Sequence, residues 1–85
     1  MEGHLSVNEL DKNRHTQLGL KIAYYRKLKG YTQAELAQKV GISTKYLSQI
    51  EAPRTVRSIS MNTLFAFSNE FDISPNKLLN FDDDI

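Results

Sequence analysis

Apolar side chains recur at helical spacing in two short neighbouring stretches of the chain, residues 33–40 and 44–51. Between the two stretches lies Gly41, which can adopt the left-handed conformation that ends a helix and reverses the chain. The pattern therefore predicts two short helices joined by a tight turn. The apolar residues on which this prediction depends are Leu36, Ala37, Val40, Leu47 and Ile50.

Before these two helices, the apolar pattern predicts one more. Leu18, Ile22 and Tyr25 share one face of a helix over residues 16–29, and Gly30 supplies its C-terminal stop. Residues 1–15 are polar and show little periodicity, so we expect a flexible N-terminal arm there.

Residues that cap helix N-termini precede the other predicted helices. Thr32 and Glu35 form a capping box, which starts a helix at Gln33. The same capping role is expected of Ser43 before residues 44–51, of Ser60 before the next helix, and of Ser74, which Pro75 follows.

The C-terminal third of the chain completes an all-α pattern. Leu64, Phe67 and Phe71 lie along one helical face and are expected in the core, to which Leu78 and Leu79 also return. The sequence thus predicts a compact bundle of five short helices. Its predicted parts are a flexible arm over residues 1–15, one domain over residues 16–81 and an acidic tail over residues 82–85.

Composition excludes several classes of protein. The 85 residues include no cysteine, which rules out a disulfide framework and a Cys-ligated zinc site. His4 and His15 have no partners at metal-ligand spacing, so we expect no metal, no cofactor and no enzymatic activity. No apolar run reaches membrane-spanning length, and the N-terminus lacks the apolar core of a signal peptide. We expect a soluble cytoplasmic protein without an evident small-molecule ligand.

The formal net charge of +1 hides an uneven distribution. Between residues 12 and 57 there are ten basic side chains and two acidic ones. From residue 61 onward there is one basic side chain and there are five acidic ones. A basic face on the half that holds the two short helices suits a polyanionic partner. Ordinary solvated charges remain the alternative interpretation.

The outward face of the 44–51 helix carries polar residues in the position that a helix-turn-helix presents to the major groove. Gln pairs with adenine, Lys with guanine, Ser with several acceptors, and Thr also with the thymine methyl group. The N-terminus of the 33–40 helix favours a phosphate, which places Gln33 beside the DNA backbone. The expected base readers are Thr44, Lys45, Ser48 and Gln49, with the capping Ser43 beside them.

Residues 18–81 resemble the phage-repressor and Cro type of helix-turn-helix domain, also called the xenobiotic-response-element family. The matching segments are LGLKIAYYRKLKGYTQAELAQKVGIS, YLSQIE, MNTLFAFSNEFDIS and PNKLL. The resemblance implies five helices, of which the second and third read DNA, and a pairing of Arg26 with Glu51. The chain departs from the family after Glu51, because Pro53 stands where a glycine is usual and the loop is about two residues longer.

Three residues near this loop complete the expected interface. Arg54 and Arg57 lie where the loop of such a domain passes the DNA backbone, so we expect phosphate contacts from both. Tyr46 either contacts a phosphate through its hydroxyl or packs on the 33–40 helix. The sequence leaves these two roles open.

The resemblance implies a sequence-specific, double-stranded-DNA-binding transcriptional regulator. Related regulators bind as two-fold dimers, so we expect a homodimer on an inverted repeat. The alternative is a protein-interaction module, such as an antitoxin, whose acidic C-terminal part docks a partner protein. DNA binding that depends on salt concentration distinguishes the two hypotheses.

Overall fold

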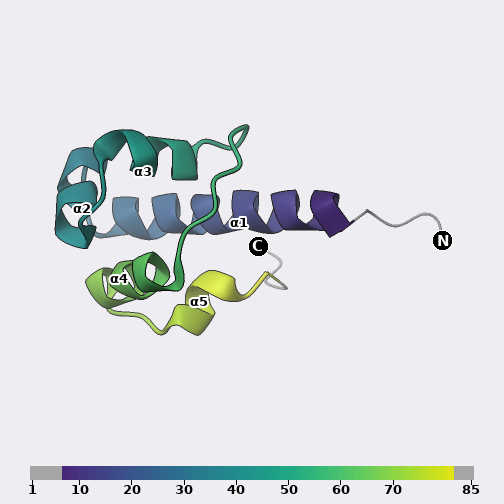
Figure 1. Cartoon of the computed structure of the whole chain (residues 1–85). Helices are drawn as coiled ribbons and strands as arrows, with labels where there is room; N and C mark the ends of the chain where they lie inside the picture. The colour runs from purple at the N-terminus through teal and green to yellow at the C-terminus, as the bar shows by residue number, and fades with distance from the viewer. Residues whose placement is uncertain (1–6, 82–85) are drawn as a thin grey trace.

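The computed structural model describes residues 7–81, which form five helices. They are α1 (Val7–Leu28), α2 (Gln33–Val40), α3 (Thr44–Glu51), α4 (Met61–Phe71) and α5 (Pro75–Leu79), with no strand in the described range. α3 lies on one side of α1, and α4 and α5 lie on the other (Figure 1). The predicted all-α fold of five helices is confirmed. Between residues 7 and 81 no helix combines the length and apolar character needed to cross a membrane.

α1 is longer than the sequence analysis predicted, because it begins at Val7 instead of Thr16. The prediction of a flexible arm was therefore wrong for residues 7–15. These turns are largely polar and extend past the other helices (Figure 1), so no apolar periodicity marks them. A helix that has already formed extends at little cost, since each added residue gains a backbone hydrogen bond without new nucleation. The rest of the predicted arm (residues 1–6) and the acidic tail (residues 82–85) lie outside the described residues.

The predicted caps stand at the starts of α2, α3 and α4. Thr32 Oγ1 accepts the backbone N–H of Glu35 at 3.1 Å, and the Glu35 carboxylate accepts that of Thr32 at 2.8 Å. This completes the capping box. Ser43 and Ser60 each accept a backbone N–H in the first turn that follows. Ser74 occupies the cap position of α5, but its side chain makes no capping hydrogen bond.

Left-handed residues end α2 and α4. Gly41 has φ of 79°, and the Ala37 carbonyl accepts the N–H groups of both Gly41 and Ile42 at 2.9 Å. This reversal turns the chain from α2 into α3, as predicted. Asp72 plays the same part after α4 with φ of 58°. An Asp side chain tolerates this conformation better than most residues do, yet the sequence analysis did not identify it.

The core brings together side chains from all the helices of the described range. Phe67 and Phe71 of α4 stack with ring centroids 6.0 Å apart, and Phe71 lies 5.7 Å from the ring of Tyr25 on α1. The prediction that these aromatics are core residues is confirmed. Leu79 is 42% exposed, so only Leu78 of the final pair returns to the core, because a single turn of helix buries one side. The buried apolar residues are Leu18, Ile22, Leu36, Ala37, Leu47, Ile50, Leu64, Phe67, Phe71 and Leu78.

α1 and α3 meet at close range at Gly19, a position that the sequence analysis did not single out. A Cβ atom on Gly19 would overlap the backbone carbonyl oxygen of Ile50. Every other amino acid has this atom, so glycine is what lets the last turn of α3 rest on α1. The position of α3 thus depends on a missing side chain as well as on apolar packing.

Candidate nucleic-acid interface

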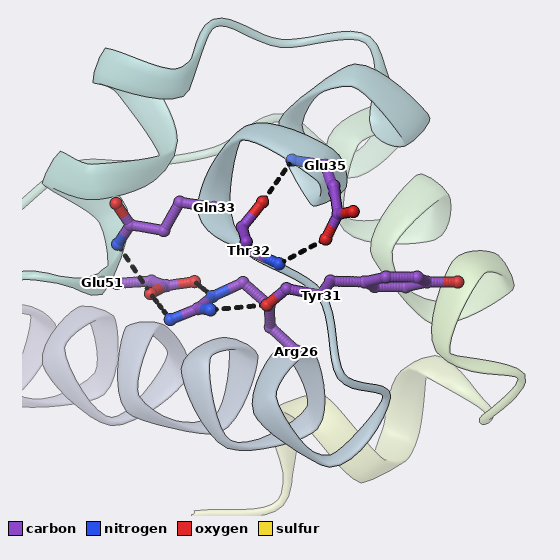
Figure 2. A network of polar contacts seen from close by, with 6 residues as sticks. All are labelled: Arg26, Tyr31, Thr32, Gln33, Glu35 and Glu51. Carbon is purple, nitrogen blue, oxygen red and sulfur yellow. Dashed lines mark hydrogen bonds and ion pairs between the residues drawn. The ribbon is translucent and has the colours of Figure 1, made fainter.

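Arg26 and Glu51 form an ion pair that joins the end of α1 to the end of α3 (Figure 2). Arg26 Nε lies 2.8 Å from Glu51 Oε2, and Nη2 lies 3.0 Å from Oε1. The remaining nitrogen, Nη1, donates to the backbone carbonyl of Tyr31 at 2.8 Å. The two side chains are only 11% and 5% exposed. The pairing that the family resemblance implied is confirmed.

The same carboxylate also holds the start of α2. Gln33 Nε2 donates to Glu51 Oε1 at 2.9 Å, which links three helix ends through one side chain (Figure 2). Buried charges stabilise a fold only when their hydrogen bonds are satisfied. Over the side chains that the structure describes, no buried polar atom lacks a partner. The network therefore fixes how α3 is oriented against α1 and α2.

Gln33, which was predicted to contact a phosphate, is thus also part of this hydrogen-bond network. One of the two hydrogens on Nε2 is given to Glu51, which leaves one for another acceptor. The Glu35 carboxylate lies at the same helix N-terminus and already offsets part of its positive end. A phosphate would be held by the remaining amide hydrogen, and this contact stays a prediction.

The outward face of α3 brings together the residues predicted to read bases. Thr44 and Lys45 are exposed, and Ser48 and Gln49 are half-buried, while the opposite face of the helix is in the core. The Ser48 hydroxyl donates to the Lys45 backbone carbonyl at 2.9 Å. Its single hydrogen is thus used within the helix, and its oxygen remains as an acceptor.

Tyr46, also in the first turn of α3, is bonded to the loop that follows the helix. Its hydroxyl donates to the Ser58 carbonyl at 2.6 Å, and Arg57 Cζ lies 5.0 Å from the centroid of its ring. A phosphate only accepts hydrogen bonds, so this hydroxyl cannot donate to one while the bond to Ser58 stands. The ring also lies against the hydrophobic core, while packing on the 33–40 helix in particular stays a prediction. Beside it, Ser43 Oγ accepts the Tyr46 N–H at 3.0 Å and keeps its own hydrogen for another acceptor.

The loop over residues 52–59 begins with a β-turn. The Thr55 N–H donates to the Ala52 carbonyl at 3.1 Å, which puts Pro53 at the second position of the turn. The fixed φ of proline suits that position, so this chain makes a proline turn where the family usually has a glycine. Arg54 follows in the turn with an exposed side chain.

A second polar contact, between the α1–α2 turn and α4, was not predicted. The Tyr31 hydroxyl donates to Glu70 Oε2 at 2.8 Å, and Lys39 Nζ lies 5.2 Å from the centroid of the Tyr31 ring. The hydrogen bond to Glu70, followed by burial and the charges of Glu70 and Glu35, raises the pKa of Tyr31 above 10.0. The partners are 39 positions apart, and no local pattern in the sequence indicates such a pair.

Comparison with known proteins places this geometry in a family. A family model described as helix-turn-helix matches residues 22–78. The HTH-type transcriptional regulator SinR of Bacillus licheniformis is 39% identical over 71 residues, covering 79% of this chain and 60% of that protein. The chain therefore spans less than two thirds of the length of this relative.

Solved structures of SinR are similar in both fold and sequence. The N-terminal DNA-binding domain of Bacillus subtilis SinR superposes with a TM-score of 0.71 at 36% identity, covering 81% of this chain and 99% of that one. SinR in complex with DNA gives 0.67 at 41% identity, with coverages of 74% and 98%. The SinR–SinI complex gives 0.69 at 39% identity, with coverages of 76% and 62%. Together with the turn at Gly41 between α2 and α3, these matches show that the chain belongs to the helix-turn-helix family and has a phage-repressor-like domain.

Proposed function

We propose that this protein is a transcriptional regulator that binds double-stranded DNA sequence-specifically, with α3 in the major groove. The observation that carries the proposal is the polar outward face of α3, a helix whose other face is buried and whose last residue is fixed by Arg26 and Gln33. Similarity to SinR, which has been solved in complex with DNA, supports it. With DNA as the partner, the proposed location is the cytoplasm.

The residues on this face have distinct tasks in the proposal. Lys45 offers hydrogen-bond donors to guanine O6 and N7, and Gln49 offers a donor and an acceptor to adenine. Thr44 contacts a base edge or the thymine methyl group. Because the Ser48 hydrogen is held by Lys45, Ser48 acts as an acceptor, which suits the exocyclic amino groups of adenine and cytosine.

Phosphate contacts surround these readers and set the orientation of the domain. Gln33 and Ser43 each keep one hydrogen, at the N-termini of α2 and α3 respectively. Arg54 and Arg57 on the following loop are exposed, and neither has a carboxylate partner within the part of the chain that the structure describes.

The proposed assembly on DNA is a homodimer on an inverted repeat. One helix-turn-helix covers only a short site, and two copies related by a two-fold axis read half-sites about one helical turn (~34 Å) apart. The exposed Leu79 and the half-buried Phe81 near α5 are the apolar residues that we assign to the dimer surface. Selection of bound sequences from a random DNA pool tests this assembly, because a dimer selects a symmetric site.

Readers and phosphate contacts are separated by comparing Lys45→Ala with Arg54→Ala. Affinity for a selected site and for random DNA is measured by gel shift across a series of salt concentrations. Lys45→Ala is expected to lose about 1–3 kcal/mol of discrimination at one base position. Arg54→Ala is expected to weaken binding to both DNAs and to lower the slope of log K against log salt by about one. Equal effects of the two substitutions on both DNAs would contradict the assignment.

A second candidate is a protein-docking function of the same domain, as in an antitoxin. The complex of the relative SinR with SinI favours it, since a protein partner is then known for a similar chain. The acidic C-terminal part would be the surface that docks the partner. A domain with this function alone would show no salt-dependent affinity for random DNA at low salt.

A further inference from the structure

Two contacts attach the loop of residues 52–59 to the first turn of α3, and both are made by Tyr46. The hydroxyl donates to the Ser58 carbonyl, and the ring lies under the guanidinium of Arg57 at a cation–π distance. Within the described part of the chain, residues 56–59 make no other hydrogen bond. Ile59 also packs against the hydrophobic core. Between the β-turn at Ala52 and Ile59, the path of residues 56–58 therefore depends on the contacts with Tyr46.

Tyr46 is itself held firmly. Its N–H is bonded to the capping Ser43, and its ring packs against the hydrophobic core. A side chain that is immobile at both its backbone and its ring can transfer that order to a loop, whereas a flexible one cannot. The position of the ring that Arg57 contacts is therefore set by α3 and the core, and not by the loop.

Arg57 has a charge that nothing in the described chain neutralises. Its guanidinium faces an aromatic ring and no carboxylate, and the side chain is exposed. A cation–π contact leaves the N–H groups at the edge of the guanidinium free to donate. Because the Arg57 guanidinium is already held in one position with N–H groups free to donate, the side chain loses less conformational entropy when it binds an anion.

We propose that Tyr46 is a positioning residue: it holds the 52–59 loop so that Arg57 stands ready for a DNA phosphate beside α3. The inference rests on the proposed DNA binding and gives Tyr46 a task other than phosphate contact. Tyr46 acts only through Arg57. Without its hydroxyl, the loop occupies the binding-competent path for a smaller fraction of the time, and affinity falls by that fraction.

The test is a double-mutant cycle on the full chain with a DNA site selected from a random pool. Tyr46→Phe keeps the ring and removes the hydroxyl, and it is combined with Arg57→Ala. Tyr46→Phe alone is expected to weaken binding about two- to tenfold, the range that the net free energy of one hydrogen bond allows. Arg57→Ala is expected to lower the salt slope by about one. In the Arg57→Ala background, Tyr46→Phe should have no further effect.

Arg54→Ala provides the matched control, because Arg54 lies in the same loop and makes no contact with Tyr46 in the described structure. Tyr46→Phe should keep its full effect in that background. Circular dichroism and thermal unfolding of each variant establish that the fold is retained. If a variant that carries Arg57→Ala unfolds, NMR relaxation of the backbone of residues 56–59 in Tyr46→Phe replaces the cycle, and lower order parameters than in the unchanged protein are expected.

Two failures can be told apart. If the unchanged protein binds DNA but Tyr46→Phe has the same effect with and without Arg57, the positioning role is overturned and the proposed function stands. Unchanged order parameters of residues 56–59 in Tyr46→Phe would overturn it in the same way. If the unchanged protein shows no salt-dependent DNA binding, the proposed function is overturned, and the task of Arg57 with it.

Discussion

At the scale of single residues, hydrogen-bond partners decide what each predicted contact residue can do. Ser48 and Tyr46 were assigned from residue type and position, but the hydrogens of both hydroxyls are donated to backbone carbonyls. Ser48 thus remains only an acceptor, and Tyr46 becomes attached to the loop. The sequence specifies which donors and acceptors exist, whereas their partners depend on rotamers and on the path of the backbone.

The ion pair between Arg26 and Glu51 leads to a stability prediction. Glu51→Gln preserves the shape of the side chain but leaves the buried Arg26 guanidinium without a compensating charge. Breaking a buried pair in this way costs about 3–5 kcal/mol, a large share of the stability of a small domain. Urea unfolding measures the change in the free energy of unfolding.

Lys45→Ala is the control for that experiment, since Lys45 is exposed and should change stability by no more than about 0.5 kcal/mol. A loss below about 1 kcal/mol for Glu51→Gln would mean that the pair is effectively solvated and does not fix α3.

At the scale of the helices, capping residues and apolar spacing were sufficient where both occur. α2 and α3 have the predicted bounds because a capping side chain, an apolar face and Gly41 all mark the same limits. The start of α1 was missed because no apolar face continues before Thr16, although Ser6 and Glu9 have the spacing of a capping box in the sequence. Apolar periodicity in the sequence indicates only the part of a helix that packs against other elements. Turns of the same helix that extend beyond the packed part show no such periodicity.

The close approach of α1 and α3 at Gly19 leads to a second prediction. In an exposed helix, replacing glycine by alanine stabilises by about 0.5–1 kcal/mol. At position 19 the added Cβ would meet the backbone of Ile50, which cannot rotate away as a side chain would. Gly19→Ala is therefore expected to destabilise the protein by about 1–3 kcal/mol, as measured by urea unfolding.

Gln17→Ala, on the exposed side of the same helix, controls for a general effect of alanine in α1. An unchanged or higher stability for Gly19→Ala would show that the two helices can separate without loss.

At the scale of the whole molecule, the contacts that could not be predicted are those between distant segments. Tyr31 meets Glu70 across 39 positions, and Tyr46 meets Ser58 across a loop whose length departs from the family. The pairing of Arg26 with Glu51 was anticipated only because the chain resembles a known family. Contacts of this kind depend on how complete elements are placed, which periodicity along one element does not specify.

The contact between Tyr31 and Glu70 makes stability depend on alkaline pH. The hydrogen bond raises the pKa of Tyr31 in the folded state above 10.0, so the folded chain keeps a proton that the unfolded chain loses. The contribution is complete below pH 10 and is lost as pH rises through the folded-state pKa. The measurement is the difference in urea midpoint between the unchanged protein and Tyr31→Phe, which should shrink over that range. A difference that stays constant with pH would contradict the coupling.

In α3, the residue that fixes the helix to its neighbours, Glu51, is not one of the residues on its outward face. This division has a consequence for how proteins with this domain diversify. The side chains of Thr44, Lys45, Ser48 and Gln49 make no hydrogen bond to any other helix in the described chain. Substitutions of the exposed Thr44 and Lys45 are therefore expected to change the stability of the fold little while they alter the chemistry offered to a partner. Under the proposed function, a duplicated copy of this chain can acquire a new recognition sequence by steps that selection for stability does not oppose.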